Sequence, residues 1–444
     1  MMYKELLIKN KINLYSFFAF VIAGVSIGLV VPGFLDMVVV LGHNIPQDDL
    51  ATDYVAAVVW AIVLGMSILA WPVPFRDKKD LLWVWFAKIL MVLGFMLIYE
   101  SHYSAMDTYL YFDGPRQSDY VWEGIKLWGS YKNMMSLIWL HHQVLPESFH
   151  ALKLSFAMIG LVAVYLFYRA AVIFLQREVK HVFYALALFP SILFMSSTIG
   201  KEPVVLLGIA LYIYGFAGWY RLKQMRYILV LMLGVTTIMF LRIWLVPIFL
   251  MPSVIVLLLS GSNRVVKMAF MVLACFVLWF SLHQVVDWMG IETIGNLVKK
   301  VDSFAIGFRR GGSQIGSVRF ASIGDVVAYV PLGIFTALFR PLPGEILSPF
   351  GLLASIENVA LLMLLWTAVK RTRWRELQEP MVIWAILLVL TWATVYGFLS
   401  HNLGTVVRYK LQILPILLGL LLYLSRRRLS GTSAFKQIKE LRAK

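Results

Sequence analysis

The sequence predicts an all-α polytopic membrane protein. Of its 444 residues, 60% are hydrophobic and only 14% are charged, and the mean hydropathy is +0.79. Soluble proteins usually carry roughly 25% charged residues, so a water-facing fold could not bury this much apolar surface. Runs of about 20 apolar residues recur along the whole length, as transmembrane helices require. Strands of a membrane barrel would instead give short alternating segments, so helices are predicted.

Twelve apolar runs are predicted to be spans, forming a single membrane domain over residues 1–444. They lie at 15–41, 54–74, 81–99, 151–175, 182–199, 203–220, 226–241, 243–260, 265–286, 350–369, 381–399 and 407–425. We interpret the first run as a retained helix, because it is too long for a signal peptide and shows no small-residue cleavage site.

Loop charges predict the orientation of these spans. Every even-numbered span ends on a basic loop, with Lys or Arg at 76–79, 177–180, 221–226, 264–267, 370–375 and 426–428. The loops after the first and third spans, at 43–53 and 100–150, are mainly acidic. Basic loops stay on the cytoplasmic side, so both termini are expected there, with 426–444 as a basic tail at the inner surface.

The net charge of +16 fits basic loops that meet anionic membrane lipids, and nucleic-acid binding is the poorer interpretation. Cys275 is the sole cysteine, so the chain has neither an intramolecular disulfide nor a thiolate metal cage. The sequence contains no His-Glu-x-x-His motif, no P-loop and no Gly-x-Ser-x-Gly motif. We therefore predict no metal site and no cofactor, and expect any sugar donor to be lipid-linked.

The segment 287–349 departs from this charge pattern, because it is basic although the loop count places it outside. Its cations include Arg309, Arg310, Arg319 and Arg340. Arginine forks bind phosphate oxygens through paired hydrogen bonds, so an anionic ligand such as a lipid diphosphate is expected here. An exposed loop without a ligand is the alternative. The apolar stretch 326–347 is broken by proline and glycine, which predicts a re-entrant element.

The outer loop 100–150 is long for a simple connection, and its aromatic residues alternate with carboxylates. A carboxylate at this face, Asp107 in particular, is suited to act as general base toward a sugar hydroxyl. The alternative is a solvated acidic loop with interfacial aromatic anchors.

Ionisable residues in apolar surroundings give further candidates, for phosphate binding in the case of cations and for catalysis in the case of Glu357. Lys201 lies in a Gly-Lys-Glu-Pro turn at the start of a helix, where free N–H groups favour anions. Arg242 lies in an apolar hairpin, where it needs a partner or a phosphate. Arg408 lies at an outer helix start, and Glu357 lies inside an apolar span. For Lys201, the alternative is a tight turn without a ligand, and for Arg242 it is contact with lipid headgroups. For Glu357, the alternative is a structural ion pair with Arg340.

These stretches together resemble a family of bacterial inner-membrane proteins. They are the long outer loop, the turn at 200–202, Arg242, the Leu-Phe-Arg-Pro-Leu-Pro-Gly-Glu element at 338–345 with Glu357, and the Asn-Leu-Gly-Thr-Val-Val-Arg stretch at 402–408. The layout is similar to that of Wzy-type polymerases and of multi-span glycosyltransferases with the GT-C architecture, which serve surface-polysaccharide synthesis. Arg340 and Gly351 also match a spacing of some polymerases, Arg followed by ten residues and Gly.

The resemblance implies transfer of a glycan from undecaprenyl diphosphate to another lipid-linked unit, in O-antigen, capsule or exopolysaccharide synthesis. It implies that arginines hold the diphosphate and that Asp107 or Glu357 is catalytic, although the acidic loop here follows the third span rather than the first. Other polysaccharide-assembly proteins are implied as partners.

Two other functions stay open from the sequence. A flippase or transporter for a lipid-linked sugar or another anion would place charges around a midplane cavity and would usually show an internal repeat. A non-catalytic scaffold of envelope assembly would tolerate removal of the outer charges.

Overall fold

The computed structural model describes residues 31–426, apart from positions 105, 118–119, 123, 125, 127–128, 260–263, 291–297, 301, 304–305, 307–312, 315–318 and 399–400. Every regular element within these residues is a helix, and an isolated β-bridge joins Gln314 to Asn402. The prediction of an all-helical chain is therefore confirmed for this part of the protein.

Six helices of the described residues are long and apolar enough to cross a membrane. They are α2 (Leu50–Ala70), the continuous unit of α3 (Phe75–Leu90), η1 (Met91–Phe95) and α4 (Met96–His102), α7 (Phe149–Leu175), α10 (Lys201–Leu222), α16 (Pro349–Arg371) and α18 (Pro380–Gly397). Helices α19 (Leu403–Lys410) and α20 (Leu414–Ser425) are separated by a short break, at which the chain bends by 70°. If these two helices are counted together, they form a seventh span. The chain is thus a polytopic helical protein.

The prediction of twelve spans is wrong, because several apolar runs form helices that are too short. Run 182–199 is divided into α8 (Lys180–Leu188) and α9 (Pro190–Met195), with Pro190 starting the second helix. Runs 226–241 and 243–260 form α11 (Arg226–Arg242) and α12 (Leu245–Leu259). At 1.5 Å per residue, the 15 residues of α12 extend about 22 Å, against a hydrocarbon core of about 30 Å. Helix α13 (Arg264–Met289) has 26 residues, and the apolar stretch within its described part is Met271–Asp287.

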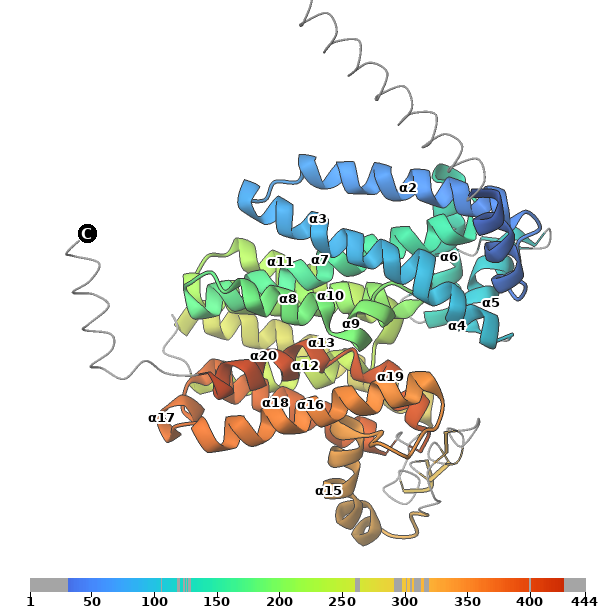
Figure 1. Ribbon diagram of the computed structural model, residues 1–444. Coiled ribbons are helices and arrows are strands. Elements are labelled where there is room, and N and C mark those ends of the chain that lie inside the picture. Colours follow the sequence, from blue (N-terminus) through green and yellow to red (C-terminus); the bar gives the residue numbers. More distant parts are fainter. Residues whose placement is uncertain are drawn as a thin grey trace, which may run out of the picture.

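Helices in Figure 1 run roughly side by side, with α2 and α3 at one edge and α16 and α18 at the other. Helix α10 lies between them and packs most extensively against α11 and α7. Glycines allow this close packing: a Cβ on Gly215 would lie 2.5 Å from the Leu231 nitrogen, and one on Gly234 would lie 2.4 Å from the Tyr212 nitrogen. Small residues let helix backbones approach in this way in membranes.

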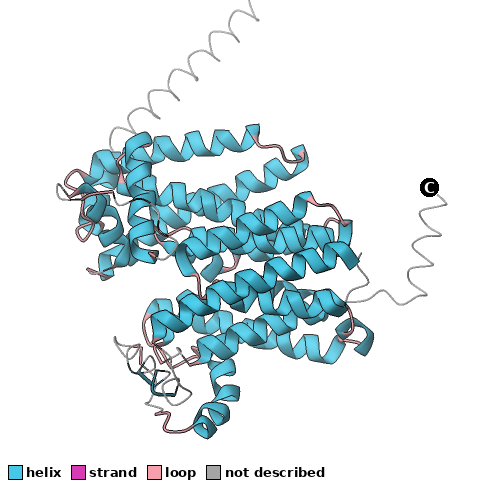
Figure 2. Cartoon of the chain, turned by 180° about the vertical axis from the view of Figure 1, so that it is seen from behind, coloured by secondary structure: helices cyan, strands magenta, loops and turns pink. Residues whose placement is uncertain are grey.

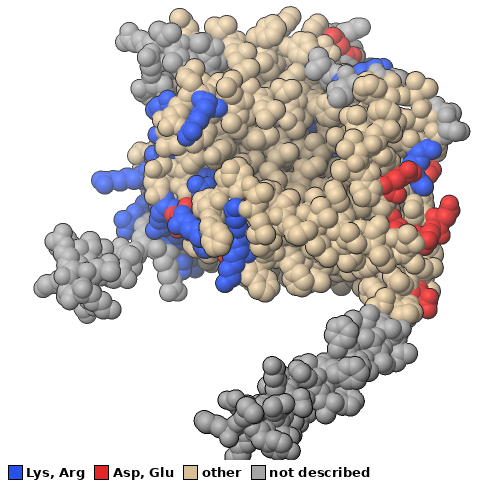
Figure 3. Space-filling model, turned by 90° about the horizontal axis from the view of Figure 1, so that it is seen from above, with Lys and Arg blue, Asp and Glu red and all other residues tan. Residues whose placement is uncertain are grey.

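Charge separates the two ends of the helical bundle. Figure 3 shows most of the visible Lys and Arg at one end, most of the visible Asp and Glu at the other, and a band largely without charge between them. The basic end contains the connections at 71–74, 176–179, 223–225 and 372–379, the last including α17 (Trp374–Leu377). Ion pairs join these connections, such as Arg221 with Glu379 at 2.9 Å. We call the opposite end, with α5, α6 and α19, the acidic end.

The segment 100–150, which was predicted to be an outer loop, is largely helical, with α5 (Asp107–Asp113), η2 (Gly114–Arg116) and α6 (Ser130–Val144). The segment predicted to be re-entrant is a single helix, α15 (Ile323–Phe339), followed by a loop rather than by a returning helix. Helix α15 runs across the direction of the bundle at the acidic end (Figures 1 and 2). It contacts α18 where Gly333 meets Gly397, since a Cβ on Gly397 would lie 2.7 Å from the Gly333 carbonyl carbon.

Substitution Gly234→Leu tests the close packing of α10 and α11. We expect it to destabilise the protein by ~1–3 kcal/mol, the usual cost of overpacking, and to lower the midpoint of thermal unfolding in detergent. Gly94→Leu is the matched control, because a Cβ on Gly94 meets nothing within 4 Å. An unchanged midpoint for Gly234→Leu would contradict this packing.

Candidate functional site

A cavity of about 280 Å³ lies at the acidic end of the bundle. Its lining comes from α4, α5, α7, α10 and α19 and from the segment around α9. Titratable groups and aromatic rings alternate on its walls, with Tyr99, Glu100, Tyr103, Asp107, Lys153, Phe194, Glu202 and Arg408 among the residues that line it. The site is therefore polar although it is surrounded by apolar helices.

Glu202 holds a central place in this site, and its position follows from the local sequence. Gly200 precedes α10 in an extended conformation, and a Cβ there would lie 2.7 Å from Glu202 Oε2. The glycine at position 200 therefore leaves room for the carboxylate, which would have to shift if this residue had a Cβ. Glu202 is also in the first turn of α10, where the helix dipole favours a negative charge.

Two arginines from distant parts of the chain share the Glu202 carboxylate. Arg242 Nη2 donates to Glu202 Oε1 at 2.9 Å. Arg408 donates through Nε to Oε1 at 2.6 Å and through Nη2 to Oε2 at 3.2 Å. Glu202 is 5% exposed and Arg242 is 4% exposed, so the charges are compensated inside the protein. Helices α10, α11 and α19 are joined at this point.

Arg408 also connects the buried carboxylate to Asp107. Its Nη1 donates to Asp107 Oδ2 at 2.7 Å, while its other two nitrogens, Nε and Nη2, donate to Glu202. The Asp107 side chain is 55% exposed, in contrast to 4% for that of Glu202. We call Asp107, Glu202, Arg242 and Arg408 the Glu202 cluster. Its outer carboxylate is accessible and its inner one is not, so only Asp107 can exchange its partner for a ligand without opening the core.

A second buried ion pair lies on another wall of the cavity. Lys153 Nζ donates to both carboxylate oxygens of Glu100, at 2.9 and 2.8 Å. Both side chains are almost completely buried. The ring of Tyr99 contacts Tyr103 and Phe194, with ring centroids 4.6 and 5.0 Å away. The cavity therefore places aromatic rings next to charged groups.

Lys410 organises a neighbouring set of contacts from the same short helix, α19. Its Nζ donates to Asn358 Oδ1 at 2.6 Å and to the Arg340 carbonyl at 3.0 Å. Glu357 accepts from the Ser191 N–H at 2.6 Å and from the Ser191 hydroxyl. We call Ser191, Arg340, Glu357, Asn358 and Lys410 the Lys410 cluster.

The predicted site residues are partly brought together. Asp107, Arg242 and Arg408 meet in the Glu202 cluster, and Lys201 adjoins it, with its Nζ 5.8 Å from the ring centroid of Tyr111. Arg340 and Glu357 belong to the Lys410 cluster instead. Arg340 pairs with Glu345, with Nε 2.7 Å from Oε1, so the expected pair of Arg340 with Glu357 is not formed.

The basic segment adds little to the described site. Arg319 is an exposed residue next to Phe320, which belongs to a small apolar cluster with Tyr329. Arg309 and Arg310, which were expected to bind phosphate, lie outside the described residues. The cations gathered around the described cavity come from α7, α10, α11 and α19.

Several buried charges escaped the sequence analysis. Lys88 lies inside α3 and donates to the Ser196 hydroxyl at 2.7 Å and to the Ser197 hydroxyl at 2.9 Å. The pair of Lys153 with Glu100 was also missed, as was Glu202 as the shared partner of two arginines. Each of these residues could have been noticed as an ionisable side chain within an apolar run. Such a side chain is costly in a membrane and usually has a specific partner. The partners themselves are too distant in sequence to be inferred.

Comparisons of the chain with protein-family models, with curated proteins and with solved structures found no match. The chemistry of the site therefore has to be argued from its own residues.

Substitution Glu202→Gln tests the role of the shared carboxylate. We expect a loss of ~3–5 kcal/mol in stability, because removing one member of a buried ion pair leaves the other charge uncompensated. The midpoint of thermal unfolding in detergent should fall clearly. Glu345→Gln is the control, because its partner Arg340 is nearer the surface and such pairs contribute only ~0–1 kcal/mol. Equal effects of the two substitutions would contradict the central role of Glu202.

Proposed function

We propose that this protein transfers a glycan from a lipid-linked diphosphate donor to a hydroxyl acceptor at the acidic end of the bundle. The observation that carries the proposal is the Glu202 cluster at the polar cavity. An accessible carboxylate, Asp107, shares an arginine with a buried carboxylate beside aromatic rings. A sugar ring can stack on Tyr99 or Tyr103 while its diphosphate meets Arg408 and Lys201.

In the proposed site, the substrate phosphate replaces Asp107 as a hydrogen-bond partner of Arg408. Glu202 binds two of the three guanidinium nitrogens, Nε and Nη2, so Nη1 keeps its direction when Asp107 leaves. A phosphate oxygen takes the place of the Asp107 carboxylate on Nη1. The released carboxylate is then free to accept the proton of the acceptor hydroxyl, as a general base does.

Bond changes in the proposed reaction are those of a substitution at the anomeric carbon. The acceptor oxygen forms a bond to this carbon and gives its proton to Asp107. The bond from the anomeric carbon to the diphosphate oxygen breaks, and the diphosphate leaves with the electron pair. Arg408 and Lys201 stabilise the charge that develops on the leaving group, where fixed cations are most effective.

The proposed setting is a bacterial inner membrane with the acidic end outward. Support comes from the basic end, because connections rich in Lys and Arg normally stay in the cytoplasm. Both termini would then be cytoplasmic. Undecaprenyl diphosphate would be the carrier, in O-antigen, capsule or exopolysaccharide synthesis, with membrane lipids and other polysaccharide-assembly proteins as partners.

Transport of a lipid-linked sugar or another anion is the second candidate, and broken helices favour it. Helix α9 has only six residues, and α19 is bent by 70° from α20. Transporters often build their binding sites from such discontinuous helices. Purified protein in vesicles distinguishes the two: a transporter moves its lipid unchanged, whereas a transferase forms a new glycosidic bond.

Substitution Asp107→Asn tests the proposed base. In a strain lacking the gene, lipid-linked saccharide should accumulate, as read by mass spectrometry of extracted lipids. Asp107→Asn should fail to relieve this accumulation, because loss of a general base lowers turnover by about 10²–10⁴-fold. Asp113→Asn on the same helix is the matched control and should complement fully. A scaffold would be indicated instead if both variants complemented equally well.

A further inference from the structure

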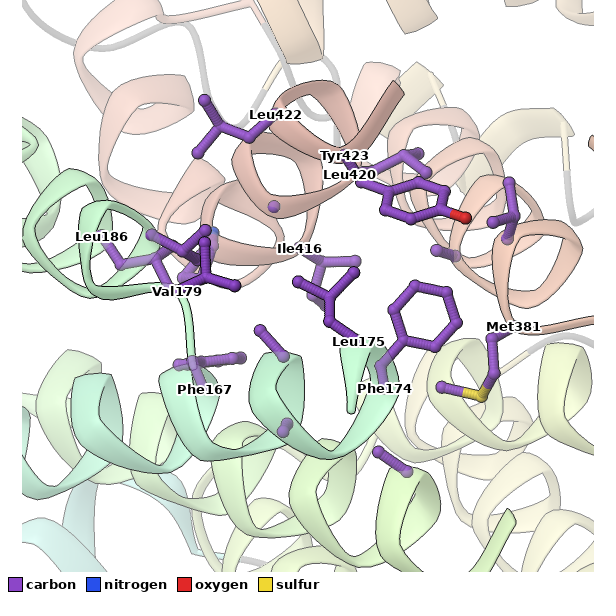
Figure 4. Close-up of a pocket in the computed structure, with 18 of the residues that line it drawn as sticks. Phe167, Phe174, Leu175, Val179, Leu186, Met381, Ile416, Leu420, Leu422 and Tyr423 are labelled. Carbon is purple, nitrogen blue, oxygen red and sulfur yellow. The ribbon is translucent and has the colours of Figure 1, made fainter. Parts of the chain in front are cut away.

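A second and larger cavity, of about 500 Å³, opens at the basic end of the bundle (Figure 4). Helices α7 and α8 form one side of it, and α18 and α20 form the other. Most of its labelled residues present carbon to the empty space, namely Phe167, Phe174, Leu175, Met381, Ile416 and Leu420. Its volume lies within the range of ligand sites, roughly 300–1,000 Å³. Such an apolar space does not hold ordered water well, because water needs polar partners.

Arginine side chains lie at the rim of this apolar cavity. Arg177, Arg371 and Arg426 line it together with His181, and none of its described lining residues is Asp or Glu. Arg177 is exposed in the connection between α7 and α8. Arg371 donates to the Ser425 carbonyl at 2.8 Å, and Arg426 pairs with Glu376. The rim therefore has an excess of positive charge beside an apolar interior.

We propose that this cavity holds one hydrocarbon chain of an anionic phospholipid, with the lipid phosphate at Arg177 and Arg371. The two halves of such a lipid match the two parts of the site, an apolar interior and a cationic rim. A neutral apolar ligand would match the interior of the cavity but not the positive charge of its rim. The proposal concerns the opposite end of the bundle from the Glu202 cluster and does not depend on glycan transfer.

Headgroup charge should decide the affinity of this lipid site. The hydrocarbon chain of a lipid moves into the cavity from a bilayer or micelle that is equally apolar. Its burial therefore contributes little to the binding free energy. Each Lys or Arg near a membrane surface strengthens the binding of anionic lipid roughly fivefold. Phosphatidylglycerol should therefore bind more tightly than phosphatidylcholine with identical chains.

The charge of the rim is tested on the purified full-length protein in detergent. Phosphatidylglycerol and phosphatidylcholine with the same chains are titrated separately, and bound lipid is counted by native mass spectrometry. Arg177→Gln should weaken the binding of phosphatidylglycerol roughly fivefold and that of phosphatidylcholine, whose net charge is zero, by less. Arg375→Gln is the control, because Arg375 is exposed at the same end but does not line the cavity.

The apolar interior is tested by filling it. Gly419 lines the cavity, and a Cβ at this position meets nothing within 4 Å. Gly419→Leu should therefore fold normally and reduce binding of both lipids at least tenfold, whereas Gly94→Leu should bind as the unaltered protein does. Equal binding of the two lipids by the unaltered protein overturns the proposal, as does full binding by a folded Gly419→Leu. If Gly419→Leu has a lowered unfolding midpoint, the proposal is judged from Arg177→Gln alone, and unchanged binding of phosphatidylglycerol by that variant overturns it.

Discussion

The buried carboxylate of Glu202 is the interaction on which the acidic end depends. A single carboxylate in an apolar interior would be costly, and so would either arginine alone. Together, Glu202, Arg242 and Arg408 satisfy one another and connect three helices that are up to 206 residues apart in sequence. The outer polar cavity can be lined by charged groups because this inner set is already compensated. The accessible Asp107 is thus held by a rigid support.

The short helix α9 likewise depends on partners that are distant in sequence. Its ends leave backbone groups without partners inside the helix, and these groups are partly buried at its start and buried at its end. At its start, the Ser191 N–H donates to Glu357, a carboxylate where the dipole favours negative charge. At its end, Lys88 donates to the Ser196 carbonyl at 3.3 Å, as well as to two hydroxyls. Two buried charges therefore allow a helix to break within an apolar region.

Hydropathy and loop charge predicted the helical class and the separation of a basic from an acidic end. They failed on the number of spans, because an apolar run reveals composition but not whether a proline such as Pro190 interrupts the helix. Sequence also identified Asp107, Arg242 and Arg408 as unusual, since each lies in a context where a charge needs a reason. Their common partner stayed hidden, because Glu202 is close to them only after α10, α11 and α19 have packed.

Helix α19 carries Arg408 and Lys410 two residues apart, so the first reaches the Glu202 cluster while the second reaches the Lys410 cluster. The 70° bend separates this short helix from α20. Any rotation of α19 about its own axis would withdraw both side chains together. The contacts of α10 with Arg408 and of α16 with Lys410 therefore depend on the same orientation of one short helix.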